Sequence, residues 1–289
     1  MNTVHNGHPG LARRILSSPP ARVLVLGFVL LLMMSLNTDV MTSYAGAPVK
    51  SVQHIMAMAI AGFAVYIGYA QLIEQRAVSE LALPGMAREL GIGLLIGAGL
   101  YTTCELTLMA LGIYRINGLN PLSYMIPAIA MALSSSVFEE LLFRGVLFRA
   151  VETWFGGWAA LVVSSLVFGL THLINPQGTI EGALFIAVEA GILLAAAFML
   201  TRRLWLSIGF HLAWNYTQSA IFSGIVSGND AHQGLVRSTM KGPDWLTGGS
   251  FGVESSVLAL VVCTTTGIVM LVMAARRGKI VPPVWKRPS

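Results

Sequence analysis

The sequence has little charge: 11% of its 289 residues are Asp, Glu, Lys or Arg, whereas 55% are hydrophobic. A typical soluble domain carries roughly a quarter charged residues. This shortage argues against a soluble enzyme and against a disordered chain. The sequence also has only two cysteines, Cys104 and Cys263, and both lie in apolar runs. They argue against a disulfide scaffold and predict two buried thiols.

Long apolar runs dominate what is present. A helix that crosses a bilayer needs roughly 20 mostly apolar residues, and backbone groups in lipid must be paired within the segment. We therefore predict an all-α polytopic membrane bundle of about eight transmembrane helices. The predicted spans are residues 22–41, 53–73, 90–113, 122–150, 157–175, 181–201, 204–224 and 255–275. The first is interpreted as an uncleaved anchor, because the weak cleavage site Ala45-Gly46-Ala47 lies far from its apolar run.

The distribution of Lys and Arg orients this bundle. Most of them fall in inside loops and tails if both termini are cytoplasmic. We therefore expect a multi-pass protein of the cell membrane, in a bacterium the inner membrane. Topology explains the net charge of +5, and no nucleic-acid partner is expected. The predicted organisation is an N-terminal cytoplasmic tail (1–21), helices 1–3 (22–113), a core of helices 4–7 (122–224), an external loop (225–254), and the last helix with a basic cytoplasmic tail (255–289).

Small residues recur at four-residue spacing in the third span, at Gly93 and Gly97. Small residues on one helical face let two helices approach closely inside a membrane. We interpret this stripe as a helix-packing surface and not as a phosphate-binding loop.

Ionisable residues inside lipid are costly, so each needs a physical reason. The fourth span contains Glu139, Glu140 and Arg144. Glu140 and Arg144 are four residues apart, which places them on one helical face as an ion pair. Glu139 is rotated by about 100° from Glu140 and lacks such a partner. We predict that Glu140 and Arg144 form a brace and that Glu139 is the reactive acid or base.

Two later spans carry imidazoles at the same helical spacing. Phe168 and His172 share a face of the fifth span, and His211 and Asn215 share a face of the seventh. A histidine and an amide on one stripe can hold a metal or donate hydrogen bonds to an oxyanion. Measured from the cytoplasmic ends at a rise of about 1.5 Å per residue, these groups fall within one broad polar layer.

Three further glutamates receive less weight. Glu105 and Glu189 have no partner at helical spacing, and we predict a structural or accessory role for both. Glu254 precedes the last span, where a carboxylate is favoured at the start of a helix.

The ordered trio Glu139-Glu140-x-x-x-Arg144, Phe168-x-x-x-His172 and His211-x-x-x-Asn215 resembles the CPBP family, also called the CAAX protease and bacteriocin-processing, or Abi, family. The resemblance implies an eight-helix intramembrane endopeptidase that acts on a membrane-associated protein or peptide. It implies that Glu139 and His172 activate the attacking water. It further implies that His211 and Asn215 stabilise the oxyanion and that Glu140 and Arg144 order the site.

The role of a metal is left open by the sequence. The family is commonly described as a metalloprotease, and a metal-free glutamate mechanism has also been proposed for it. Glu139, His172 and His211 are the candidate ligands for zinc with one open position, although the chain has no His-Glu-x-x-His helix.

Two alternative functions belong to other classes. A non-catalytic membrane scaffold or immunity protein would keep the polar groups as a binding pocket. An ion-coupled transporter would use Glu105, Glu189 and the two histidines as a proton relay. Such carriers often show internal repeats, and we find none in this sequence.

Overall fold

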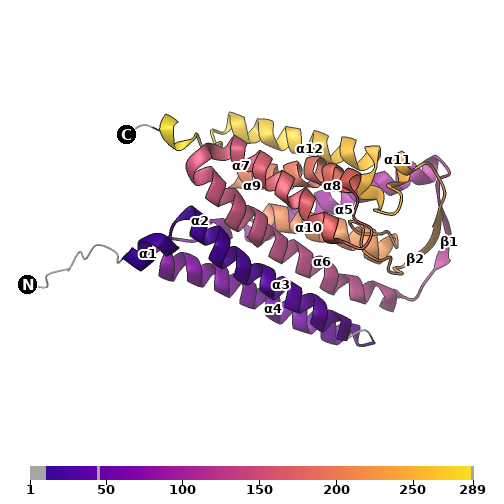
Figure 1. Cartoon of the computed structure of the whole chain (residues 1–289). Helices are drawn as coiled ribbons and strands as arrows, with labels where there is room; N and C mark the ends of the chain where they lie inside the picture. The colour runs from indigo at the N-terminus through magenta and orange to yellow at the C-terminus, as the bar shows by residue number, and fades with distance from the viewer. Residues whose placement is uncertain (1–10, 44–45, 288–289) are drawn as a thin grey trace, which may run out of the picture.

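The computed structural model describes residues 11–43 and 46–287, so the first ten residues of the predicted N-terminal tail and Ala45 of the weak cleavage site lie outside the described residues. The described chain is mostly helical, and both of its ends lie at the same end of the bundle (Figure 1). The helices are α1 (Leu11–Leu16), α2 (Pro19–Ala21), α3 (Phe28–Ser43), α4 (Pro48–Gly68), α5 (Met86–Ala110), α6 (Ile126–Glu139), α7 (Arg149–Thr171), α8 (Ile180–Ile186), α9 (Ile192–Thr201), α10 (Trp205–Tyr216), α11 (Asp244–Thr247) and α12 (Val257–Arg276).

Shorter helical turns extend or join several of these helices. A π-helical segment follows α6 without a break, and π-type turns also lead into α9 and out of α10. In all, the π-helical segments of the described chain are Arg22–Gly27, Tyr69–Ile73, Glu140–Phe148, Ala187–Gly191 and Thr217–Ile221. Single 3-10 turns are Ser79–Leu81, Leu122–Met125, His172–Ile174, Val253–Ser255 and Val284–Lys286. Isolated π-turns within helices are frequent at functional sites, and two of these turns directly adjoin helices that carry the predicted polar motifs.

Membrane-spanning helices are evident within the described part of the chain. Six rods there are long and apolar enough to cross a bilayer: Pro19–Asn37, Pro48–Ile73, Met86–Ala110, Leu122–Ile174, Ile180–Thr201 and Val257–Arg276. The rod Leu122–Ile174 is 53 residues long and breaks at Gly156, where φ is 80° and ψ is 174°. The rod formed by α10 and its π-turn is not among the six. The chain is thus a multi-pass helical membrane protein, while eight crossings stay a prediction.

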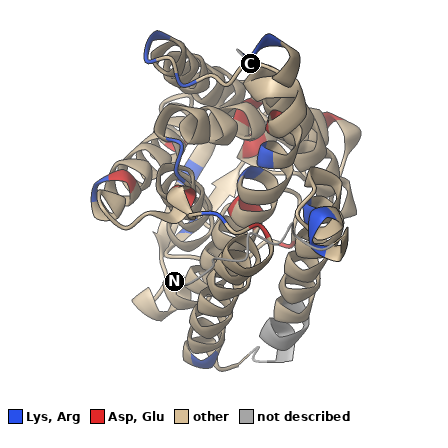
Figure 2. Ribbon diagram, turned by 90° about the vertical axis from the view of Figure 1, so that its left-hand side faces the viewer, with Lys and Arg blue, Asp and Glu red and all other residues tan. Residues whose placement is uncertain are grey.

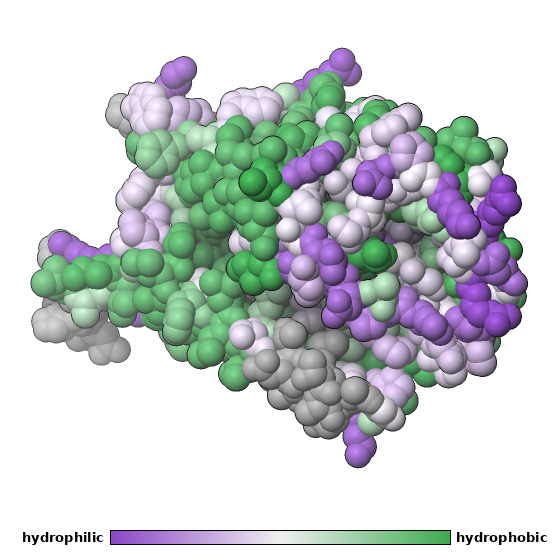
Figure 3. All heavy atoms as spheres, turned by 45° about the vertical axis from the view of Figure 1, so that its right-hand side comes forward, coloured by the Kyte–Doolittle hydropathy of each residue, from purple (hydrophilic) through white to green (hydrophobic). Residues whose placement is uncertain are grey.

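The flank of the bundle is apolar. Large hydrophobic side chains such as Leu24, Ile60 and Leu95 are exposed on the outer faces of their helices. Figure 3 shows apolar residues over much of this flank and polar residues gathered toward the end that carries the strands. This distribution suits a surface that faces lipid along its sides and water at its ends.

Very close helix packing joins α5 to α10. A Cβ atom added at Gly93 would overlap the backbone oxygen of Leu206, and one added at Gly97 would overlap that of Phe210. The two helices therefore meet backbone to backbone along the glycine stripe, and the predicted packing surface is confirmed. Because α10 carries His211 and Asn215, this contact sets the position of two site residues.

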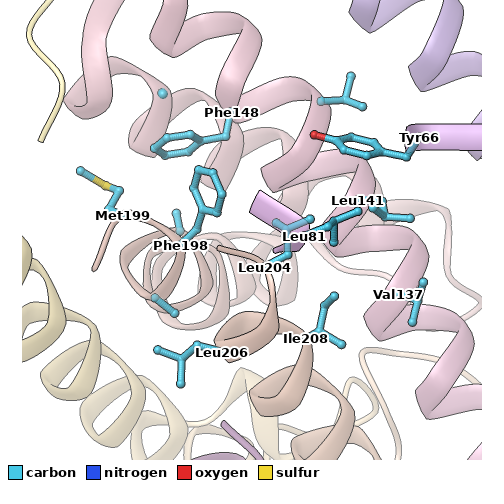
Figure 4. Close-up of a cluster of buried hydrophobic side chains, with 14 of the residues drawn as sticks. Tyr66, Leu81, Val137, Leu141, Phe148, Phe198, Met199, Leu204, Leu206 and Ile208 are labelled. Atoms are coloured by element: carbon cyan, nitrogen blue, oxygen red, sulfur yellow. The ribbon is translucent and has the colours of Figure 1, made fainter. Parts of the chain in front are cut away.

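A buried apolar core lies between the helices toward the end that carries the chain termini. Phe148 and Phe198 meet there edge to face, with ring centroids 5.3 Å apart (Figure 4). Tyr66 is fully buried in the same core, and its hydroxyl lies 2.6 Å from Oε1 of Glu80 and 3.0 Å from the backbone oxygen of Gly145. This core joins α4 to the segment Glu140–Phe148 and so supports the helix that carries the acidic pair.

One two-stranded antiparallel sheet lies at the opposite end of the bundle (Figure 1). It pairs β1 (Tyr114–Leu119) with β2 (Val236–Met240), with Tyr114 opposite Met240 and Leu119 opposite Val236. The all-α prediction left out this ribbon, because its strands come from two loops that are far apart in the sequence. Pairing satisfies the backbone groups of both loops where no helix is available.

The contact between α5 and α10 leads to a test. Substitution Gly97→Ala is expected to lower the free energy of unfolding by about 1–3 kcal/mol, because overpacking forces two backbones apart. Gly99→Ala on the same helix is the matched control, since an added Cβ there meets nothing within 4 Å. Thermal unfolding in detergent checks this, and equal melting of both variants would contradict the close approach.

Candidate active site

The acidic pair and the arginine of the fourth predicted span lie where α6 passes into the segment Glu140–Phe148. The Oε1 atom of Glu140 lies 2.9 Å from Nη1 of Arg144, and both side chains are fully buried. Arg144 also donates from Nη2 to the backbone oxygen of Gly191 at 3.2 Å. The structure thus places these two residues in the geometry of the predicted brace, and ties it to the helix pair α8–α9.

His211 brings α10 against both glutamates. Its Nδ1 lies 3.1 Å from Oε1 of Glu140, and its Nε2 lies 3.9 Å from Oε2 of Glu139. A carboxylate only accepts hydrogen bonds, so Nδ1 carries the proton that is shared with Glu140. Oε2 of Glu139 and Oε2 of Glu140 both lack a hydrogen-bond partner among the described residues. Oε1 of Glu140 is held by both Arg144 and His211, whereas no Lys or Arg of the described residues pairs with Glu139, in line with the helical spacing.

Phe168 is the common neighbour of the charged and imidazole groups. Its ring lies 4.6 Å from Cζ of Arg144, and its centroid lies 4.9 Å from the His172 ring and 6.1 Å from the His211 ring. A cation over an aromatic face is attracted by the ring quadrupole. Phe168 of α7 thus packs against the segment Glu140–Phe148 and against α10, and it holds the two histidines around one apolar surface.

The tautomer of His172 follows from its hydrogen bond. Its Nδ1 lies 2.8 Å from the backbone oxygen of Phe168, four residues earlier. A carbonyl oxygen can only accept, so Nδ1 is the protonated nitrogen. In the neutral ring Nε2 then carries a lone pair, which can accept a proton from water.

His172, His211 and Asn215 line one small cavity in the interior of the bundle. Its volume is about 20 Å³, and a cavity needs at least about 10–15 Å³ to hold one water molecule. Asn215 donates from Nδ2 to Oγ of Ser135 on α6 at 2.9 Å. The acidic pair and Arg144 are not among the residues that line this cavity in the described chain. Glu139 instead lies next to His211, which does line the cavity.

Glu254 also lines this cavity, and the sequence interpretation missed it. Its Oε1 accepts a hydrogen bond from Nε1 of Trp214 at 3.0 Å, and its Oε2 accepts from the backbone N and the Oγ of Ser227 at 2.5 and 2.8 Å. Its carboxylate therefore bonds Trp214 of α10 and Ser227 of the preceding loop, and it does not cap the start of α12. Burial raises the pKa of the Glu254 carboxyl above its ordinary value, and the hydrogen bonds from Ser227 oppose this rise.

The two remaining buried glutamates differ from each other. Glu105 accepts a hydrogen bond from the hydroxyl of Tyr101 at 2.9 Å, so the prediction that it lacks a partner at helical spacing is wrong. That prediction considered only charged partners, although Tyr101 lies four residues earlier. Glu189 is fully buried and lines the cavity, and neither of its carboxylate oxygens has a hydrogen-bond partner among the described residues.

The proposed zinc ligands do not form a coordination sphere in this structure. Among the described residues, no group of three or more His, Cys, Asp or Glu side chains is arranged to hold a metal ion. Nδ1 of each histidine is already engaged, by Phe168 or by Glu140. Zinc binding by Glu139, His172 and His211 stays a prediction.

Comparison with known proteins bears on the segment that contains the three motifs. Residues 121–217, about a third of the chain, match the family model described as type II CAAX prenyl endopeptidase Rce1-like. No curated protein and no solved structure matches the chain. The matched segment contains all six predicted site residues, from Glu139 to Asn215. The predicted resemblance to the CPBP family is thereby confirmed for residues 121–217, which are similar to the Rce1-like family model.

Proposed function

We propose that this chain is an intramembrane endopeptidase of the CAAX-protease type, which hydrolyses a peptide bond in a membrane-associated protein or peptide. The observation that carries the proposal is the meeting of His172, His211 and Asn215 around one buried cavity with room for a water molecule. Glu139 lies against His211 at the edge of this arrangement. The Rce1-like match of the same segment supports hydrolysis at the level of the family.

In the proposed reaction, a water molecule in the cavity attacks the carbonyl carbon of the scissile bond. The free lone pair on Nε2 of His172, together with the Glu139 carboxylate, takes the proton from this water. The tetrahedral oxyanion accepts hydrogen bonds from the side chains of Asn215 and protonated His211. The proton then passes to the leaving nitrogen, the C–N bond breaks, and a carboxylate and an amine result.

The charges around His211 support its assigned role. Glu140 lies at its Nδ1 and Glu139 lies near its Nε2. An imidazolium with protons on both nitrogens can donate to Glu140 and to an oxyanion at the same time. Arg144 holds the Glu140 carboxylate in place. The brace therefore acts by positioning His211, and it does not itself touch the reacting atoms.

We also propose the topology that the sequence predicts, with eight crossings of a bacterial inner membrane and both termini cytoplasmic. The break at Gly156 divides the rod Leu122–Ile174 into two crossings. The short α10 rod supplies a further crossing inside the bundle. A cysteine placed at Asp230 is then expected to react with an impermeant thiol reagent added outside the cell, and labelling only after lysis would contradict this orientation.

The assigned role of Glu139 has a direct test. Glu139→Gln is expected to lower the cleavage rate by about 10²–10⁴-fold, the usual contribution of a general acid or base. The variant is expected to keep its fold, because Oε2 of Glu139 has no hydrogen bond to lose within the described part of the chain. The assay uses purified protein in lipid vesicles with a transmembrane peptide substrate selected by comparing new protein termini in wild-type and variant membranes.

Glu181→Gln is the matched control for this experiment, since Glu181 is an exposed glutamate at the start of α8 within the same domain. It is expected to cleave at the wild-type rate. Undiminished cleavage by Glu139→Gln would remove the proposed general base.

The question of zinc has a separate test. The described donors are not grouped around a metal position, so we expect cleavage by the reconstituted protein to persist in the presence of a zinc chelator. Metal analysis of the purified chain is expected to find less than one zinc per molecule. Loss of cleavage with the chelator and its return on addition of zinc would instead establish a metal site.

A further inference from the structure

A second cavity lies away from the candidate active site, at the end of the bundle that carries the chain termini. It opens where α7 begins, where α9 ends and where the C-terminal segment folds back onto the bundle. Its volume is about 170 Å³. It is lined by Arg149, Glu152, Thr153, Arg202, Val281 and Arg287. We call it the basic pocket.

The basic pocket has more arginines than carboxylates. Glu152 is its one acidic lining residue among those described, and it binds Arg202 through two hydrogen bonds of 2.7 and 2.5 Å. Within the described chain, Arg287 donates only to the backbone oxygens of Glu152 and Pro282. No carboxylate of the described chain is paired with the Arg287 guanidinium, which leaves a positive charge at the mouth of the pocket.

The charges behind the pocket do not cancel this excess. Arg149 pairs with Glu80, and the same carboxylate also pairs with Arg76 at 2.8 Å. Arg76 in turn shares Glu74 with Arg22. Arginines therefore outnumber carboxylates in the pocket and in this chain of ion pairs. The arginines are Arg22, Arg76, Arg149, Arg202 and Arg287, and the carboxylates are those of Glu74, Glu80 and Glu152. Figure 2 views this end of the molecule and shows Lys and Arg ribbons around it with fewer acidic ones between.

One wall of the pocket is fixed by the fold. The backbone N of Gly157 donates to the backbone oxygen of Val281 at 2.8 Å. Gly156 has a φ of +80°, and a Cβ atom there would lie 2.7 Å from the backbone N of Pro283. The C-terminal segment is thus docked against the break in the long rod, and it holds Arg287 beside α7.

Exposed aromatic residues lie next in sequence to the residues of α7 and of the C-terminal segment that line the basic pocket. Trp154, Phe155, Trp158 and Trp285 are 42%, 51%, 55% and 66% exposed. The Phe155 ring lies 6.4 Å from Trp154 and 6.2 Å from Trp285, so three of these residues form one cluster. Trp and Tyr are enriched at the level of lipid headgroups, where an aromatic body and a polar atom both find suitable surroundings. The pocket therefore lies at the headgroup level of the bilayer, at the end of the apolar rods.

We propose that the basic pocket binds the phosphate of an anionic phospholipid headgroup, with the acyl chains lying along the aromatic cluster. Guanidinium groups pair well with phosphate oxygens, and basic pockets between helices at the cytoplasmic surface suit anionic lipids. The exposed aromatic residues favour a lipid over free phosphate, because a soluble anion gains nothing from them. This site is separate from the candidate active site and does not depend on proteolysis.

The test measures which lipids the full chain retains. The purified protein is equilibrated in nanodiscs with equal amounts of phosphatidylglycerol and phosphatidylcholine, and lipids bound after mild detergent extraction are counted by native mass spectrometry. Wild type is expected to retain phosphatidylglycerol preferentially. Arg287→Gln is expected to lose this preference by roughly fivefold, the factor that matches one basic residue at an anionic surface. Arg287→Lys is expected to keep most of it, because the charge remains.

Arg277→Gln is the matched control, because it removes an exposed arginine from the same tail that does not line the pocket. It is expected to behave as wild type. All variants are compared after their melting temperatures show that they are folded. Equal loss in Arg277→Gln and Arg287→Gln would reduce the effect to general surface charge and overturn the proposal. Displacement of phosphatidylglycerol by inorganic phosphate, with equal thermal protection from phosphate alone, would assign the pocket to a free anion and also overturn it.

Discussion

The carboxylate of Glu140 and the guanidinium of Arg144 are both removed from solvent, in a bundle whose surroundings offer them no water. An isolated charge in such a place costs several kcal/mol, and the loss of one partner leaves the other uncompensated. The pair must therefore stay together, and its remaining contacts decide what surrounds it. Glu140 accepts a hydrogen bond from His211 of α10, while Arg144 donates to the backbone oxygen of Gly191 and lies over the ring of Phe168. Three separate parts of the chain are thus gathered around one ion pair.

The site acquires its asymmetry from this arrangement. Glu140 is fixed at Oε1 by Arg144 and His211, whereas no Lys or Arg of the described residues pairs with the neighbouring Glu139. Nδ1 of His172 donates to a backbone oxygen, so Nε2 is the ring nitrogen that can accept a proton in the proposed reaction. The glycine stripe of α5 allows α10 to lie close enough for these contacts. Packing, charge pairing and tautomer therefore act together on the same small cavity, and the basic pocket at one end of the bundle is built by a different set of arginines.

Local spacing predicted much of this structure. The pairing of Glu140 with Arg144 and the close approach at Gly97 both follow from positions four residues apart on a helix. Tyr101 and Glu105 have the same spacing and were equally predictable. The contacts of Glu254 with Trp214 and Ser227 were not, because they join residues far apart in the sequence and depend on how a loop returns to the bundle. The ribbon of β1 and β2 and the pairing of Arg202 with Glu152 have the same non-local origin, and no periodicity in the sequence signals them.

The central claim is that a buried ion pair organises the site, and a double-mutant cycle on that pair tests it most directly. The free energies of unfolding are measured for wild type, Glu140→Gln, Arg144→Met and the double variant in one detergent. Each single substitution is expected to cost about 3–5 kcal/mol, because it leaves a buried charge unpaired. The double variant is expected to cost less than the sum of the two by about 0.5–3 kcal/mol. Additive losses, or single variants as stable as wild type, would contradict the account.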